Sequence, residues 1–192
     1  MFGSALLGAF LLIATYTDVR WRIVHNGTTY GGTVAAWLAS GMATWAGVDS
    51  GSGTPADVAR WGLPPLWDSL LGCLVCGAMM LVCYLFFARE LGGGDVKLIA
   101  MIGAFLGPYG GLEVMLWTMV IGGVMALVIL VWRVGAVRLV GILWRYAQAA
   151  AGGRKPELLD DERAAMRTDL FLSPSALLAV VIVRGWSSGG AA

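Results

Sequence analysis

The sequence predicts an all-α protein, a polytopic membrane bundle of about six transmembrane helices with its N-terminus outside the membrane. Three observations predict this class. Of the 192 residues, 58% are hydrophobic and only 13% are charged, and the mean hydropathy is +0.77, which is far from the values of soluble proteins. Apolar segments recur at about the length that a bilayer crossing needs, roughly 20 residues. The basic residues gather in the loops on one side.

Six apolar segments carry this prediction, and because they leave little length for a soluble domain, we expect a single domain over residues 1–192. The first segment has no basic residue ahead of it and is followed by Arg20 and Arg22, which favours a retained helix over a cleaved signal peptide. The fourth is short for a full crossing, so we expect it to begin in a protein-lined cavity. The segments cover about residues 2–17, 28–48, 66–88, 96–107, 112–132 and 170–186.

The distribution of Lys and Arg predicts the orientation, since these residues concentrate in cytoplasmic loops. With the N-terminus outside, eleven of the 13 basic residues fall on the inner side, and the other two are Arg60 and Arg184. Seven of the eleven lie in one long inner loop, residues 133–169, and without it the balance is still four against two. The ends of the first and fourth segments that carry Asp18 and Asp95 then both face the cytoplasm.

The two long loops differ in character. Residues 49–65 are rich in Gly, Ser and Pro and are interpreted as a connector. The inner loop can form an amphipathic helix that lies on the inner leaflet or docks against the bundle. Its acidic continuation is interpreted as a solvated turn in preference to a catalytic acid; the acidic residues are Glu157, Asp160, Asp161 and Glu162.

Two aspartates lie in places that a membrane protein normally avoids. Asp18 ends the first apolar segment, and Asp95 opens the fourth. A carboxylate near the hydrocarbon is costly, so such a residue marks a functional site. Two close carboxylates share one proton, so that one acts as a base toward water while the other acts as an acid toward the scissile carbonyl and the leaving amine. The pair predicts an intramembrane aspartyl protease that requires no metal or cofactor.

The run Gly92-Gly93-Gly94 directly before Asp95 supports the same hypothesis. Residues without a Cβ permit close approach of backbone, which would let an extended peptide reach the carboxylate. Lys97 would then interact with a carboxylate or with a lipid phosphate. The alternative is a glycine-rich loop between helices, with Asp95 as the N-cap of the next helix and Lys97 as an interfacial residue. Both interpretations remain open at this point.

These residues resemble a known family. The run from Gly92 to Lys97 looks like the GxGD motif of prepilin peptidases, the type IV leader peptidase family of membrane aspartyl proteases. The run from Asp18 to Asn26 resembles that family's first motif, although Val24-His25 stands where Ile-Pro is common. The resemblance implies that Asp18 and Asp95 are catalytic. The residues that would support the site are Gly92, Gly94, Lys97, Arg20, Arg22 and Asn26.

The resemblance also implies a substrate and a location. The substrate would be a prepilin-like protein with a short basic leader, cut at the cytoplasmic face of the inner membrane just before an apolar helix. Larger members carry an additional region with cytoplasmic Cys pairs that methylates the new N-terminus. The chain has little sequence around Asp18 for such a region, so we expect a short form without methyltransferase activity.

Other functions are weighed against this one. A net charge of +1 and the lack of a basic cluster argue against nucleic-acid binding. Cys73 and Cys76 lie in an apolar segment without a second pair, so packing is favoured over a metal or redox site. The spacings Gly27-x-x-x-Gly31 and Gly103-x-x-x-Gly107 are interpreted as close helix contacts. A proton-coupled membrane transporter and a non-catalytic prepilin-binding membrane protein remain as alternatives.

Overall fold

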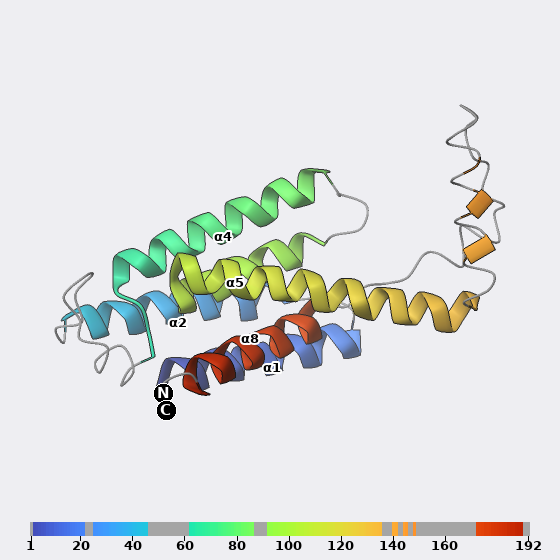
Figure 1. Cartoon of the computed structure of the whole chain (residues 1–192). Coiled ribbons are helices and arrows are strands. Elements are labelled where there is room, and N and C mark those ends of the chain that lie inside the picture. Colours follow the sequence, from blue (N-terminus) through green and yellow to red (C-terminus); the bar gives the residue numbers. More distant parts are fainter. Residues whose placement is uncertain are drawn as a thin grey trace. The chain divides into compact units, whose positions relative to one another are not determined.

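The computed structural model describes residues 2–21, 25–45, 62–86, 92–135, 140–141, 144–145, 148 and 172–189. For residues 186–189 it describes the backbone and not the side chains. The described residues form helices and no strands, which confirms the predicted all-α class (Figure 1). The helices are α1 (Phe2–Trp21), α2 (Asn26–Trp45), α4 (Leu66–Phe86), α5 (Gly93–Val134) and α8 (Leu172–Gly189).

The chain divides into two compact units. The first contains Met1–Met119 and Phe171–Ala192, and it holds α1, α2, α4, α8 and α5 up to Met119. The second, Val120–Leu170, holds the rest of α5. Most of the inner loop, with its predicted amphipathic helix and acidic run, lies outside the described residues. The single domain over residues 1–192 stays a prediction.

Helix α5 contains the fourth and fifth predicted segments, joined without a loop. Gly107 has φ 74° and ψ −179° inside this helix and is followed by Pro108. At this point the chain reverses direction, so that α5 consists of two arms (Figure 1). A Cβ on Gly111 would lie 2.8 Å from the Cα of Gly103, which shows how closely the arms approach beside the turn. Glycine at position 107 is what permits so short a reversal.

Replacing Gly107 with Ala is expected to destabilise the protein by about 1–2 kcal/mol, because this combination of φ and ψ is almost restricted to glycine. The cause would be backbone strain and not crowding, since the nearest atom to an added Cβ, the Cβ of Pro64, is at 3.6 Å. Thermal unfolding in detergent measures the effect. Gly123→Ala is the control, because Gly123 lies within α5 with no atom within 4 Å of an added Cβ. Equal melting of the two variants would contradict the interpretation.

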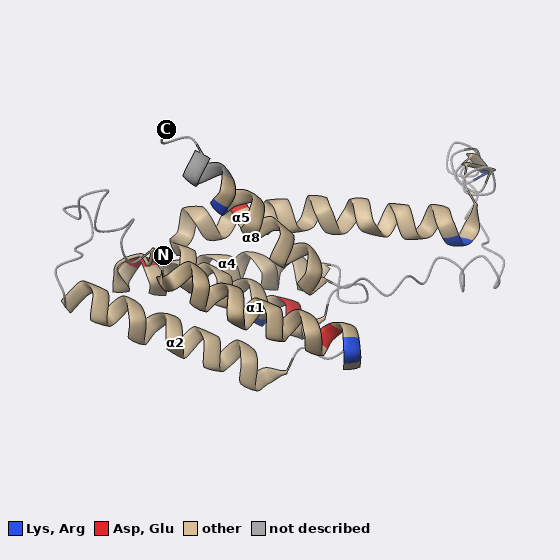
Figure 2. Ribbon diagram, turned by 90° about the horizontal axis from the view of Figure 1, so that it is seen from below, with Lys and Arg blue, Asp and Glu red and all other residues tan. Residues whose placement is uncertain are grey.

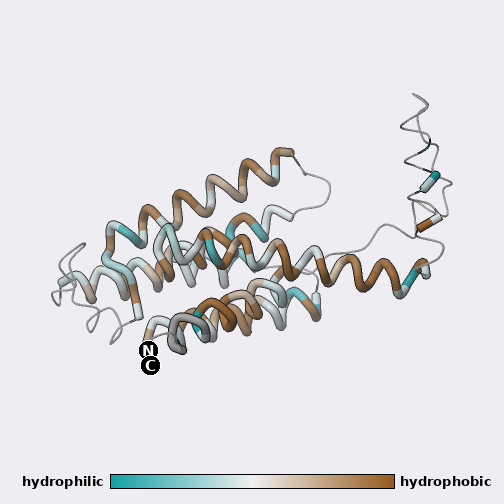
Figure 3. The backbone as a smooth tube through the Cα atoms, viewed as in Figure 1, coloured by the Kyte–Doolittle hydropathy of each residue, from teal (hydrophilic) through white to brown (hydrophobic). Residues whose placement is uncertain are grey.

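The helices have the length and polarity of a membrane protein. Helices α1, α4 and α5 are long and apolar enough to span a bilayer, and α8 has a shorter apolar stretch, Leu172–Gly185. Figure 3 shows apolar residues along these helices. Many of their large apolar side chains are exposed, as expected of surfaces that contact lipid; examples are Leu12, Leu74, Leu85, Leu127 and Val181.

Helix α2 is more polar, and three of its threonine hydroxyl groups form hydrogen bonds within the helix. Thr29, Thr33 and Thr44 each donate a hydrogen bond to a backbone carbonyl three or four residues earlier. Such back-bonding removes a polar group from apolar surroundings at little cost. Helix α2 packs against α1 and α4, and α1 also packs against α8.

The first arm of α5, residues 93–106, is enclosed by the other helices. Its residues Ile99, Ile102 and Phe105 are fully buried. The Phe105 ring lies 6.3 Å from that of Phe10 in α1, and the Ser69 hydroxyl of α4 donates to the Ala104 carbonyl at 2.6 Å. An arm surrounded by protein need not span the bilayer alone, which agrees with the expectation for the short fourth segment.

Glycine contacts hold this arm against α4, and they test the two predicted packing motifs. A Cβ on Gly103 would overlap the carbonyl of Gly72, and one on Gly72 would lie 2.8 Å from the Cα of Gly107. The predicted contact at Gly103 and Gly107 is therefore confirmed. The one at Gly27 and Gly31 is wrong for the part of the chain described, because no atom lies within 4 Å of a Cβ at either position. Cys76 is fully buried, as its predicted packing role requires.

Candidate active site

Asp18 lies on the buried side of α1, one turn before its end. Leu7, Leu11 and Ala14 precede it on this side at helical spacing and are fully buried. The Asp18 side chain is 8% exposed. Its Oδ2 atom has no hydrogen-bond partner among the described residues. A buried acidic side chain at the end of a membrane helix marks Asp18 as a candidate functional residue.

Asp95 lies in the first turn of α5 and is half-buried. The Gly92 N–H donates to Asp95 Oδ2 at 3.1 Å, and the Asp95 N–H donates to the Gly92 carbonyl at 3.0 Å. Asp95 is thus the third helical residue and reaches back to the residue before the helix, as in half of a capping box. The alternative in which Asp95 is itself the N-cap is therefore wrong. The backbone N–H of Gly92 holds one carboxylate oxygen in place.

The glycine run leaves space on the approach to Asp95. Gly92 and Gly93 are exposed, and no described atom lies within 4 Å of a Cβ added at Gly93. A Cβ at Gly92 would lie 3.4 Å from Asp95 Oδ2, which is ordinary van der Waals contact. Gly94 is half-buried inside the first turn. The open backbone at residues 92 and 93 is compatible with a peptide that approaches the carboxylate.

The two aspartates lie at the same end of the first unit. The end of α1 and the beginning of α5 point toward the same end of the first unit (Figure 1), and each carries an acidic position (Figure 2). Acid–base catalysis by a carboxylate pair needs two carboxyl groups at one end of the bundle, where both can reach the same substrate bond.

Two of the expected supporting residues contact each other. The Lys97 ammonium donates to Asn26 Oδ1 at 2.7 Å and lies 4.9 Å from the centre of the Tyr30 ring. Asn26 and Tyr30 are one turn apart at the start of α2, so they present one face to Lys97. We call these three residues the Lys97 latch, because they join the beginnings of α2 and α5. Tyr30 was not among the residues predicted from the sequence. Its position four residues after Asn26 does indicate that the two side chains lie on one face of a helix.

The remaining predicted residues are less constrained. Arg20 is exposed in the last turn of α1, and Arg22 lies outside the described residues. Trp21 makes edge-on ring contacts with Tyr16 at 6.0 Å and with His25 at 6.2 Å. His25 is exposed, and its carbonyl accepts bonds from the backbone N–H groups of the first turn of α2. It directly precedes the first residue of α2, Asn26.

Breaking the Lys97 latch is expected to reduce activity without unfolding the protein. Lys97→Met removes both the hydrogen bond and the cation–π contact, and we expect about a tenfold loss of kcat/KM because Asp95 shares its helical turn with Lys97. Tyr30→Leu should cost a few-fold, since only the ring contact is lost. Tyr30→Phe is the matched control, because it keeps the ring. A Phe variant as impaired as the Leu variant would contradict the role of the ring face.

The fold and the site together define a class: a helical membrane protein with two acidic side chains at one end of its bundle. A family model described as the type IV leader peptidase family matches residues 5–127, which is 123 of the 192 residues. The chain therefore belongs to the type IV leader peptidase family, and the resemblance noted in the sequence is confirmed. This membership supports a peptidase function and a location in a membrane. Among curated proteins and solved structures, none gives a significant match.

Proposed function

We propose that the protein is a membrane-embedded aspartic endopeptidase that removes the short leader of prepilin-like proteins, with Asp18 and Asp95 as its catalytic dyad. The observation that carries the proposal is the buried side chain of Asp18, whose Oδ2 atom has no hydrogen-bond partner among the described residues, at the end of the bundle where α5 begins with Asp95. Both residues fall within the stretch that the family model matches.

The proposed mechanism uses the two carboxyl groups and a water molecule. The ionised partner takes a proton from water, which attacks the scissile carbonyl, while the protonated partner donates to the carbonyl oxygen. As the tetrahedral intermediate collapses, the carboxyl group that took the proton from water donates it to the leaving amine, and the former carbonyl oxygen returns its proton to the other carboxylate. The Gly92 N–H fixes one oxygen of Asp95 during these steps. The two carboxyl groups exchange these roles during the reaction, so neither residue is assigned permanently as acid or base.

The proposed substrate must reach the dyad in extended form, because a helical peptide hides its amides in its own hydrogen bonds. The exposed backbone at Gly92 and Gly93 offers such an approach. We place this end of the bundle at the cytoplasmic face of the inner membrane, on the basis of the Lys and Arg distribution. The exposed Arg20 beside Asp18 is consistent with a position at the membrane surface.

The test is cleavage of a prepilin-like substrate by the purified full chain in lipid, with the products identified by mass spectrometry. We expect one cut directly before the apolar helix of the substrate, and we expect it to persist in the presence of a metal chelator. A panel of leaders that yields no cut by the folded protein, or a cut that the chelator abolishes, would sink the proposal.

A proton-coupled transporter is the second candidate, because buried acidic residues such as Asp18 also occur in proton pathways. Liposomes with an imposed pH gradient separate the two functions. Transport predicts a gradient-driven flux without peptide cleavage, whereas the peptidase predicts cleavage with or without the gradient. Substrate capture with neither outcome would indicate the non-catalytic binding protein.

A further inference from the structure

The hydroxyl group of Ser173 is a buried polar group that the proposed mechanism does not yet use. Ser173 is the second residue of α8 and is fully buried. Its Oγ atom has no hydrogen-bond partner among the described residues. A buried hydroxyl that forms no hydrogen bond costs free energy, so such groups in proteins are normally bonded to protein or to ordered water. The position of Ser173 therefore requires an explanation.

Two other buried hydroxyl groups at this end of the bundle are bonded within their own helices. Ser175 is 1% exposed and donates to the Leu172 carbonyl at 2.7 Å. Thr17, which precedes Asp18, donates to the carbonyl of Ala14 at 3.0 Å. Such bonds are the usual way in which a helix satisfies a serine or threonine hydroxyl. Ser173 differs from both, because its hydroxyl remains available for a further group.

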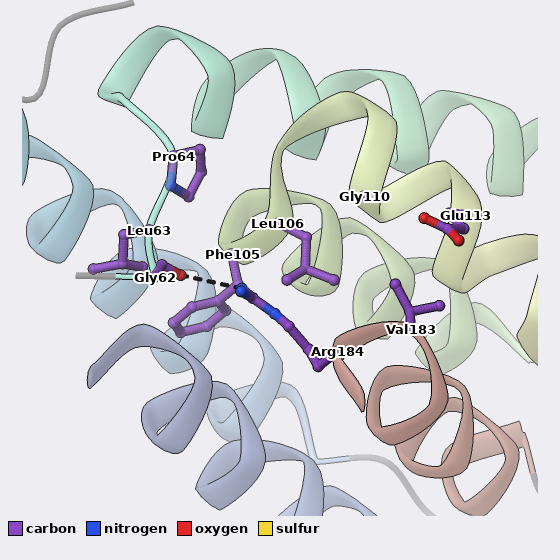
Figure 4. Close-up of a pocket in the computed structure, with 9 residues that line it drawn as sticks. All are labelled: Gly62, Leu63, Pro64, Phe105, Leu106, Gly110, Glu113, Val183 and Arg184. Atoms are coloured by element: carbon purple, nitrogen blue, oxygen red, sulfur yellow. Dashed lines mark hydrogen bonds between the residues drawn. The ribbon is translucent and has the colours of Figure 1, made fainter. Parts of the chain in front are cut away.

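The beginning of α8 lies near the level of Asp18. Helices α1 and α8 pack against each other in opposite directions (Figure 1). At their other ends both approach the Gly62 carbonyl oxygen: Arg184 Nη2 donates to it at 3.1 Å (Figure 4), and a Cβ on Gly3 would lie 2.7 Å from it. Eleven residues separate Arg184 from Ser173, which is about 16 Å of helix. Fifteen residues separate Gly3 from Asp18, which is about 22 Å. Ser173 and Asp18 thus differ in level by roughly one helical turn.

Both side chains face the interior of the first unit. Asp18 is 8% exposed and Ser173 is fully buried. Asp18 Oδ2 and Ser173 Oγ each have no hydrogen-bond partner in the described part of the chain. One water molecule with two hydrogen bonds of roughly 2.8 Å bridges oxygens about 5 Å apart, which suits two packed helices at this offset. Buried water molecules bind to polar groups of this kind.

We propose that Ser173 positions the attacking water of the dyad; this inference rests on the proposed function. The water donates one hydrogen to Asp18 Oδ2 and the other to Ser173 Oγ, which leaves an oxygen lone pair directed at the scissile carbonyl. In the attack, the first hydrogen passes to Asp18 as a proton and the new C–O bond forms. The π electrons of the carbonyl move to its oxygen, which takes a proton from Asp95. Ser173 keeps its own proton throughout, so it is a positioning residue.

Ser173→Ala separates this role from a structural one. We expect kcat to fall about tenfold, the effect of one lost hydrogen bond to a reacting group. KM should not change, because Ser173 holds the water and not the substrate. The melting temperature should stay at or slightly above that of wild type, since no protein group loses a hydrogen-bond partner. A residue that only packs would change stability and rate together.

The other variants test whether the hydroxyl itself is responsible. Ser173→Thr keeps the hydroxyl and should retain most of the wild-type rate. If the additional methyl group prevents folding, Ser173→Cys takes its place, and its weaker acceptor should give a kcat between those of wild type and Ser173→Ala. Ser175→Ala is the matched control, because it removes a bonded hydroxyl from the same turn. It should lower the melting temperature slightly and leave kcat unchanged.

A crystal structure of the full chain in a lipidic phase tests the water without a protease readout. Wild type should hold an ordered water within hydrogen-bond distance of both Asp18 Oδ2 and Ser173 Oγ, and Ser173→Ala should lack it. A wild type without this water, or a folded Ser173→Ala variant with the wild-type kcat, would overturn the inference and leave the proposed function intact. A fall in kcat that only follows the melting temperature would do the same. Failure of wild type to cleave any prepilin-like substrate would overturn both.

Discussion

Replacing Asp18 or Asp95 with Asn is expected to reduce cleavage of a prepilin-like substrate by at least about 10³-fold. The amide keeps the size and shape of the side chain but can neither accept the proton of the attacking water nor deliver one to the leaving amine. Because the two carboxyl groups act as a unit, the double variant should lose little more than either single variant. Initial rates with purified protein in lipid measure the effect, and an unchanged melting temperature shows that each variant is folded.

Asp68→Asn is the matched control for this prediction. Asp68 is the third residue of α4, as Asp95 is the third residue of α5, and both side chains are half-buried. Asp68 lies near Gly107, however, at the end of the first arm that is remote from Asp95. Its substitution should leave the rate close to that of wild type. Substantial cleavage by Asp18→Asn or Asp95→Asn, or an equal loss in Asp68→Asn, would contradict the dyad.

Much of the helical architecture follows from hydropathy alone, because each apolar segment must be long enough for the bilayer. The six predicted segments correspond to α1, α2, α4, the two arms of α5, and α8. The tight reversal could not be predicted. The sequence leaves residues 108–111 between two apolar segments, whereas the structure needs only the backbone conformation of Gly107 and the following Pro108. A hydropathy pattern contains no information about a single dihedral angle.

The candidate site was predictable to the extent that it depends on rare residues. Carboxylates at the ends of apolar segments are uncommon, so Asp18 and Asp95 were visible in the sequence. The position of Asp95 as the third helical residue was not, because a run of three glycines allows α5 to begin at several places. The Lys97 latch joins residues far apart in the chain, and only packing reveals such contacts.

Replacing Gly103 with Ala is expected to destabilise the protein by about 3 kcal/mol, the upper part of the range for overpacking. The added Cβ would overlap the Gly72 carbonyl and lie 2.9 Å from the Cβ of Cys76. A clash with a backbone atom of α4 cannot be relieved by a rotamer change, so the first arm of α5 must shift. This arm carries Asp95, and cleavage should therefore fall together with stability. For a chain of this size we expect the Tm to fall by roughly 6–12 °C.

Gly31→Ala is the control, because Gly31 occurs in the same four-residue glycine spacing but has no described atom within 4 Å of an added Cβ. Alanine favours the helix over glycine by about 0.5–1 kcal/mol where space allows, so this variant should melt at or slightly above the wild-type temperature. Gly103 and Gly31 occur in the same sequence pattern. A difference in stability between the two variants would therefore show that the close contact at Gly103, and not the pattern, causes the loss. If both variants lost stability equally, the close approach of α4 and α5 at Gly103 would not be the cause.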